Sequence, residues 1–289
     1  GRHRALASAL AVTSGFAILL PLVLLSQQRA ANARIQEEAD RAQRSFTIAL
    51  HSIDDLLLRV GRDRLRNVPA AQTLGADLVR EAVAAYERLA IERPDSPDVA
   101  VQLVRGLSAL ATYHYQFGRI DELDATAARI LEILPAEVDL DVGWRIERAT
   151  AHWYQGLAEG ARGRHKLAEA TLLRALVDLD GLPVLVGRER VVAAFRRARI
   201  HAALAATVAA DGRVVEAGPH WTHAVEVLRA VEIDEASRDE RDRLLAPYLF
   251  DRALHAWYMD DLALAGEGLV EALKATEARS PEDMGWPTA

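Results

Sequence analysis

The uncharged run from Ala5 to Leu25 constrains this chain more than any other feature. About 20 apolar residues rising 1.5 Å each span a hydrocarbon core of roughly 30 Å. A helix satisfies its own backbone there, and membrane helices tolerate the glycine and proline of this run. The run predicts one transmembrane helix at 5–25, after a cytoplasmic stump at 1–4.

A cleaved signal peptide is the alternative interpretation of this run. The basic start fits a signal peptide, and Ala31-Asn32-Ala33 is a small-residue cleavage pattern. The run is long for a signal core, so its length favours the anchor. We therefore expect a single-pass protein of the inner (cytoplasmic) membrane with an extracytoplasmic body. Because the chain begins with Gly1 and not Met, we also expect it to be part of a longer protein.

The charge of the body limits its partners. Residues 1–34 hold four of the 35 basic residues and no acid, so the remainder carries 31 basic and 42 acidic residues, a net charge of −11. An acidic body argues against nucleic acid as a partner. The chain has no cysteine, which excludes disulfides, thiol catalysis and thiolate metal sites.

Residues 26–68 predict a juxtamembrane helix followed by a turn. Apolar residues recur there with the 4-3 spacing of a heptad stripe. One interpretation is a stalk that forms a homodimer through the 35–60 helix. The other is an amphipathic helix packed on the following domain, which the small alanines favour. The stripe consists of Ile35, Ala39, Ala42, Phe46, Ala49, Ile53, Leu56 and Val60.

Residues 69–279 predict a tetratricopeptide-like α-solenoid of four to five helix pairs, followed by a tail at 280–289. Turns are expected near Gly118, Gly163 and Gly212, between segments of helical periodicity. The tetratricopeptide period is roughly 34 residues. Pro94 and Pro135, which close successive units, are separated by more than this period, so we expect a longer first helix in that unit. No strand-like alternation occurs, and the predicted fold class is all-α.

Residues 42–97 carry a more specific pattern. Asp54-Asp55-Leu56-Leu57 with Val60 matches a V-D-D-h-h-x-x-V motif, in which Ile53 replaces the first valine. Arg64-Leu65 with Pro69 matches R-L-x-x-x-P, and Ala84, Tyr86-Glu87 and Leu89 match A-x-Y-E-x-h. This stretch resembles the region that follows the membrane span in bacterial, planctomycete-type receptor serine/threonine protein kinases.

The resemblance implies that a kinase domain precedes the span and that tetratricopeptide units follow it. Asp54, Asp55, Arg64, Pro69 and Tyr86 are the family-motif positions. The chain itself has no glycine-rich loop, no His-Arg-Asp loop and no Asp-Phe-Gly. It therefore cannot transfer phosphate, and we expect no cofactor.

Few residues suggest other chemistry. Adjacent helical residues point about 100° apart, so neither Asp54-Asp55 nor Asp260-Asp261 forms a catalytic dyad. His220, His223 and Glu226 share a helical spacing and are a weak metal candidate. The alternative is an ordinary histidine pair at a helix start.

Partner-binding candidates lie on the first helices of the units, which line the inner groove of such solenoids. The aromatic candidates are Tyr113, Tyr115, Trp153 and Trp257, for which core packing is the alternative. The basic candidates are Arg190, Arg196, Arg197 and Arg199, which could hold an acidic peptide. A solvated face paired with neighbouring acids is the alternative for these arginines.

The leading hypothesis is a non-catalytic, membrane-anchored sensor region of such a kinase, which binds a protein or peptide ligand in its groove. A stand-alone tethered or secreted interaction scaffold is the second hypothesis. An enzyme built on the solenoid is the third, because no convergent polar constellation is visible.

Overall fold

The computed structural model describes single residues between 28 and 53, and then the ranges 71–134 and 141–277. The chain divides into two compact units, Gly1–Asp54 and Asp55–Ala289. The described residues of the first unit are all helical. No strand occurs among the described residues of either unit. The helices of the second unit are α2 Gln72–Glu92, α3 Pro97–Gln116, α4 Ile120–Ile133, α5 Val142–Ala161, α6 His165–Asp180, α7 Gly187–Ala210, α8 Val214–Ala230, α9 Glu235–Tyr258 and α10 Leu262–Glu277.

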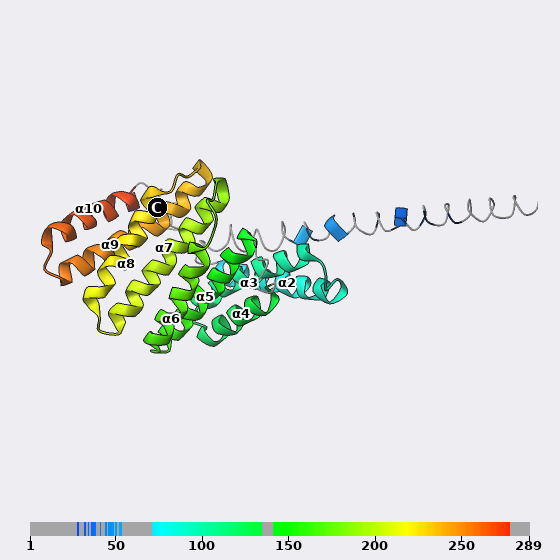
Figure 1. Ribbon diagram of the computed structural model, residues 1–289, viewed down its shortest axis with the longest axis horizontal. Coiled ribbons are helices and arrows are strands. Elements are labelled where there is room, and N and C mark those ends of the chain that lie inside the picture. The colour runs from blue at the N-terminus through cyan, green and yellow to red at the C-terminus, as the bar shows by residue number, and fades with distance from the viewer. Residues whose placement is uncertain are drawn as a thin grey trace, which may run out of the picture. The chain divides into compact units, whose positions relative to one another are not determined.

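Four short turns fold these helices into pairs. Each turn contains one residue in the left-handed conformation: Gly118 (φ 66°), Gly163 (φ 75°), Gly212 (φ 84°) and Asp260 (φ 63°). Glycine adopts this conformation without a steric cost, and aspartate tolerates it better than most residues. Such short turns make consecutive helices antiparallel neighbours. The pairs are α3–α4, α5–α6, α7–α8 and α9–α10 (Figure 1).

The repeat is longer than the predicted tetratricopeptide pattern. The left-handed residues stand at positions 118, 163, 212 and 260, and each interval between them exceeds the tetratricopeptide period of roughly 34 residues. The first helices of the pairs have 20 to 24 residues, whereas the second helices have 14 to 17. The first helices therefore account for most of the excess length.

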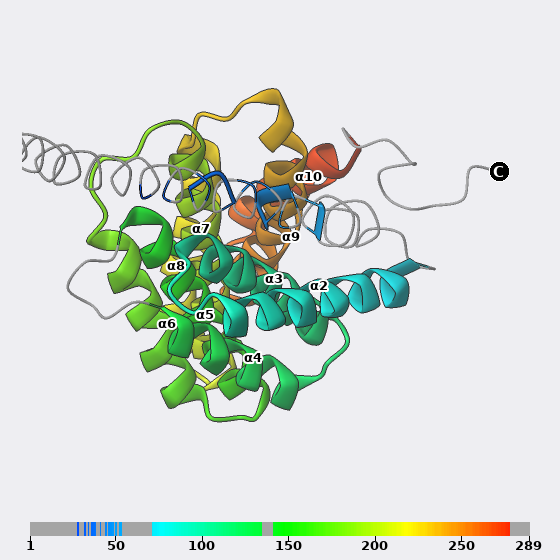
Figure 2. The same ribbon diagram turned by 90° about the vertical axis from the view of Figure 1, so that its right-hand side faces the viewer.

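The pairs stack so that each first helix contacts both helices of the preceding pair. Thus α5 contacts α3 and α4, α7 contacts α5 and α6, and α9 contacts α7 and α8. Helix α2 packs against α3 at the start of the stack. Figure 1 shows the helices side by side in chain order, from α2 to α10, and Figure 2 shows the same stack with the α2 end toward the viewer. This nearest-neighbour stacking is the architecture of an α-solenoid.

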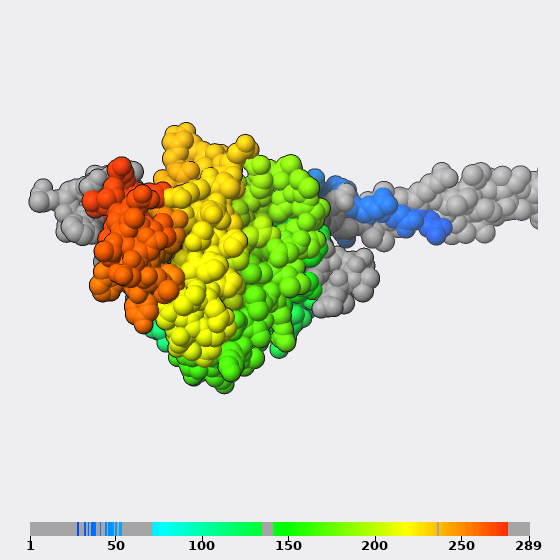
Figure 3. Space-filling model, turned by 60° about the vertical axis from the view of Figure 1, so that its left-hand side comes forward, coloured from blue at the N-terminus to red at the C-terminus, as the bar shows by residue number. Residues whose placement is uncertain are grey.

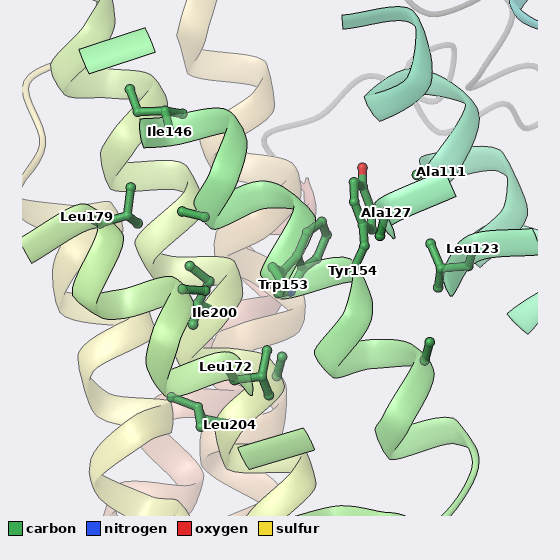
Figure 4. Packing of buried hydrophobic residues seen from close by; sticks show 14 of the residues in the cluster. Ala111, Leu123, Ala127, Ile146, Trp153, Tyr154, Leu172, Leu179, Ile200 and Leu204 are labelled. Atoms are coloured by element: carbon green, nitrogen blue, oxygen red, sulfur yellow. The ribbon is translucent and has the colours of Figure 1, made fainter. Parts of the chain in front are cut away.

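The core lies between successive helices and combines small with large side chains (Figure 4). Gly156 on α5 faces Leu172 on α6, whose side chain is fully buried. A Cβ atom on Gly156 would lie 2.6 Å from Cγ of Leu172, so only glycine lets these helices approach as they do. Nearby, the hydroxyl of Tyr154 on α5 donates to the carbonyl of Ser108 on α3 at 3.0 Å. Apolar burial together with such satisfied polar contacts stabilises the stack.

Several ion pairs between successive helix pairs share nearly the same sequence separation. Their partners lie 41 to 44 residues apart, a little less than one repeat. Because corresponding positions of adjacent pairs lie side by side in a solenoid, opposite charges at this separation meet. The pairs are Arg162 with Asp121, Arg190 with Glu232, Arg199 with Glu240, and Arg213 with Glu169.

The fold-class prediction needs a correction. The described residues form an all-helical stack, consistent with the predicted solenoid. None of the described helices, however, has both the length and the apolar character that crossing a membrane requires. The predicted transmembrane helix and the single-pass location in the inner membrane are corrected on this finding. The run 5–25 itself, residues 54–68 of the juxtamembrane segment and the tail 280–289 lie outside the described residues.

Candidate partner-binding site

The side chain of Arg199 on α7 contacts residues of the two neighbouring first helices, α5 and α9. Its guanidinium carbon lies 5.8 Å from the ring centre of Trp153 on α5. Its charge also interacts with Tyr154 and with Tyr248 on α9, and Tyr248 in turn interacts with Tyr115 on α3. We call this set the arginine–aromatic cluster; its members are Tyr115, Trp153, Tyr154, Arg196, Arg199, Glu240 and Tyr248.

Arg199 is largely enclosed by the cluster. Its side chain pairs with Glu240 on α9 at 2.9 Å. Burial lowers the pKa of Arg199 from its ordinary value, and the positive charge of Arg196 lowers it further. A guanidinium over an aromatic face gains cation–π attraction when it is desolvated. Arg199 therefore depends on the negative charge of Glu240 and on the face of Trp153.

Arg196 has no such compensation. It lies one helical turn before Arg199, close enough for the two charges to repel each other. No hydrogen bond or ion pair to Arg196 occurs among the described residues, although its side chain is only partly exposed. The cluster therefore contains two neighbouring guanidinium groups and one carboxylate.

Two further donors of the cluster lack acceptors. Nε1 of Trp153 and Nε of Arg199 are buried and have no hydrogen-bond partner in the described part of the chain. A buried donor without an acceptor costs roughly 1–3 kcal/mol. Burial also raises the pKa of Tyr248 to about 12, so its hydroxyl stays protonated and able to donate. The cluster is therefore rich in hydrogen-bond donors and poor in acceptors.

The other predicted arginines are already paired. Arg190 binds Glu232 at 2.5 Å on the exposed surface. Arg197 binds Asp180 at 3.0 Å and donates to the carbonyl of Leu179. For these two residues the structure shows the neighbouring acids that the alternative interpretation expects.

The predicted aromatic candidates separate into buried and exposed residues. Tyr113 is buried and stacks on Phe117, with ring centres 6.0 Å apart. Trp153 is buried within the cluster, Tyr115 is half-exposed beside it, and Trp257 is exposed at the end of α9. Of the family-motif positions, Tyr86 is buried on α2, and the other four lie outside the described residues.

Glu240 belongs to the cluster but was absent from the sequence candidates. A sequence signal for Glu240 exists, because it follows Arg199 by 41 residues, like the other inter-repeat ion pairs. That signal requires the true repeat length, which the tetratricopeptide pattern does not supply.

A separate cluster of three histidines joins α7 to α8. Nδ1 of His201 lies 3.2 Å from Nδ1 of His220, and the rings of His201 and His223 stack at 5.2 Å. Burial, followed by the charges of the other two histidines, lowers the pKa of His201 to about 4. His201 is therefore neutral at pH 7. His201 from α7, and not the exposed Glu226, is the third residue of this group.

The histidine cluster does not provide a metal site. Across 71–134 and 141–277, no group of three or more histidine, aspartate or glutamate residues is placed to hold a metal ion. The weak metal candidate of the sequence analysis thus finds no support in this geometry.

Stacked helix pairs and a cluster shared by four first helices define the chain as an α-solenoid. Comparison with known proteins agrees with this class at the level of the fold. No family model matches the chain, and no curated protein matches it. Among solved structures, the crystal structure of BtubC (BKLC) from P. vanneervenii is similar, with a TM-score of 0.53 and 15% identity over 72% of this chain and 77% of that chain. At this identity the likeness concerns the fold alone.

Proposed function

We propose that the chain is a protein-interaction module, without catalytic activity of its own, that binds an acidic segment of a partner protein at the arginine–aromatic cluster. The observation that carries the proposal is Arg196, a partly buried guanidinium with no acidic partner among the described residues, beside a second arginine. A ligand carboxylate would relieve the repulsion between the two guanidinium groups.

The cluster suits a peptide carboxylate for two reasons. A guanidinium presents a planar fork of donors that matches a carboxylate in bidentate geometry. The aromatic side chains around it offer apolar area and hydroxyl donors at little cost in conformational entropy. The acidic segment would lie across α3, α5, α7 and α9, so that one ligand contacts four repeats.

The resemblance of residues 42–97 supplies the context for this proposal. In the resembling kinases this region follows the kinase domain, so we propose that the module serves as the partner-binding part of a serine/threonine kinase. Sequencing the gene upstream of the codon for Gly1 tests this context. A kinase signature there supports it, and its absence would leave the stand-alone interaction scaffold.

Selection of peptides from a random peptide library on phage tests the binding site. We expect the selected peptides to be rich in Asp and Glu, and their binding to weaken at high salt. Arg196→Gln should weaken binding at least tenfold. Arg197→Gln is the matched control, because it removes the same charge from the adjacent residue, which is already paired with Asp180.

The two variants decide the outcome. Arg197→Gln should bind the selected peptides within about twofold of the wild-type chain, since paired surface arginines contribute little to a site they do not face. Equal losses in both variants would mean that only the overall charge matters. Selected peptides without acidic residues would also contradict the proposal.

A further inference from the structure

Helix α9 carries a carboxylate whose charge the chain leaves uncompensated. This helix belongs to the end of the stack that Figure 3 brings forward, in orange to red. Its Asp251 is half-buried, and no hydrogen bond or ion pair to this side chain occurs among the described residues. Burial raises the pKa of Asp251, and no positive charge offsets that effect. Because a carboxylate withdrawn from water is normally paired, Asp251 lacks a counter-charge that a ligand can supply.

Asp251 lies on the side of α9 that bears the arginine–aromatic cluster. It follows Glu240 by about three helical turns, so the two carboxylates share one face of the helix. Glu240 marks the direction of this face, because it pairs with Arg199 on α7 at 2.9 Å. The opposite side of α9 packs on α10 through Ala253. Tyr248, which stands between the two carboxylates in the sequence, interacts with the charges of both Arg199 and Asp251.

The site therefore contains uncompensated charges of both signs. Arg196 on α7 is a guanidinium without an acidic partner among the described residues, and it lies close to the guanidinium of Arg199. Asp251 is the corresponding carboxylate without a basic partner in the described part of the chain. A ligand that satisfies both groups carries an acidic and a basic side chain.

The distance between the two groups indicates how far apart those ligand side chains stand. Three turns of α9 measure roughly 16 Å at 1.5 Å per residue, which separates the level of Glu240 and Arg199 from that of Asp251. An extended peptide advances about 3.3 Å per residue, so roughly five residues cover this distance. Tyr248 lies between the two levels, and the half-exposed Tyr115 on α3 interacts with it.

We propose that the acidic segment bound at the cluster also carries a lysine or arginine about five residues from its acidic residue, and that Asp251 receives this basic side chain. The inference rests on the proposed function and adds a second, oppositely charged contact to the same site. Arg196 places the acid and Asp251 places the base, so the segment binds in one register. A uniformly acidic segment would instead bring negative charge against Asp251, which disfavours it.

Synthetic peptides of defined charge pattern test the inference by fluorescence anisotropy with the full chain. The main probe has two glutamates and a lysine five residues away, separated by serine and glycine, and it is made in both orders of acid and base. One comparison peptide has glutamine in place of the lysine, and another has the lysine directly beside the glutamates. We expect the main probe, in one of its two orders, to bind about tenfold more tightly than either comparison peptide.

Two variants of α9 locate the contact of the lysine. Asp251→Asn keeps the shape of the side chain and removes its charge, so it should bind the lysine and glutamine peptides within about twofold of each other. Asp239→Asn is the matched control, because it removes the same charge from the same helix at a residue that already pairs with Arg243 at 3.2 Å. It should keep the preference for the lysine peptide. Circular dichroism confirms that both variants are folded.

A charge exchange gives a result that loss of folding cannot imitate. Asp251→Lys should bind a peptide with glutamate in place of the lysine more tightly than the lysine peptide, which reverses the order of the wild-type chain. An unchanged order would overturn the inference.

The outcomes separate this inference from the proposed function. If the lysine adds nothing to binding while Arg196→Gln still weakens it, the inference is wrong and the proposed function stands. Equal loss of the lysine preference in Asp251→Asn and Asp239→Asn would reduce the contact to overall charge and also overturn the inference. If Arg196→Gln leaves binding unchanged, the proposed function fails and the inference fails with it.

Discussion

Replacing Gly156 by alanine tests whether the cost of packing against Leu172 outweighs the stability gained from the higher helix propensity of alanine. In an exposed helix interior this change stabilises a protein by about 1 kcal/mol. At Gly156, however, the new Cβ atom would lie 2.6 Å from Cγ and 2.7 Å from Cδ2 of Leu172. Leu172 is fully buried, and Cγ is the branch point of its side chain, so it cannot turn away. Overpacking of this kind costs about 1–3 kcal/mol.

The overpacking cost exceeds the gain in helix propensity, so the substitution should lower the stability of the protein. With the contact near the upper end of that range, Gly156→Ala should lower the free energy of unfolding by about 1–2 kcal/mol. For a folded region of this size, the melting temperature should fall by about 3–6 °C. Thermal unfolding followed by far-ultraviolet circular dichroism measures the change.

Gly266→Ala is the control for this experiment. It makes the same substitution in another helix, where no atom lies within 4 Å of the new Cβ. The melting temperature should therefore rise by about 2–4 °C. In a double-mutant cycle, Leu172→Ala should relieve the Gly156→Ala clash, with a coupling of about 1–2 kcal/mol. A Gly156→Ala protein as stable as the wild type would refute the packing argument.

Three further predictions follow from polar groups in the stack. The pKa of His201 is about 4 in the folded chain against 6.5 in the unfolded chain, so the unfolded state binds more protons and stability falls as the pH drops from 6.5 toward 4. Allowing for partial exposure of the ring, the free energy of unfolding should be about 1–2 kcal/mol lower at pH 5 than at pH 7, as measured by urea titration. His201→Asn should remove this difference. Asp178→Asn removes the ion pair that Asp178 forms with the partly buried Arg148 at 2.7 Å, and it should lower the free energy of unfolding by about 2–4 kcal/mol. A decrease below about 1 kcal/mol would contradict a buried pair. Tyr154→Phe removes the hydroxyl that donates to a carbonyl on α3 and should cost about 1–2 kcal/mol, whereas the exposed Tyr115→Phe should change the melting temperature little.

The sequence predicted the local structure of the stack well. Glycines 118, 163 and 212 were expected in turns, and all three adopt the left-handed conformation there. Asp260 takes the same role in the last pair. These residues carry their signal locally, because a positive φ selects glycine or aspartate whatever lies around it.

The arrangement of the candidate site was less accessible from the sequence. Whether an arginine is paired depends on an acid one repeat away, as with Arg199 and Glu240, and thus on the true repeat length. Leu269 on α10 follows the helical spacing of the buried Ala265 and Ala272, yet it is 46% exposed. In α10 the packing against α9 instead selects small residues, which a single sequence does not show.

The short turns within the pairs have a mechanical consequence. Each described helix pair closes on itself through a turn and packs mainly on its neighbours, so the packing among the described helices runs along the chain from one pair to the next. A pulling force applied at the ends would therefore extract one hairpin after another. Each event would lengthen the chain by one repeat, the interval between successive left-handed residues at 118, 163, 212 and 260.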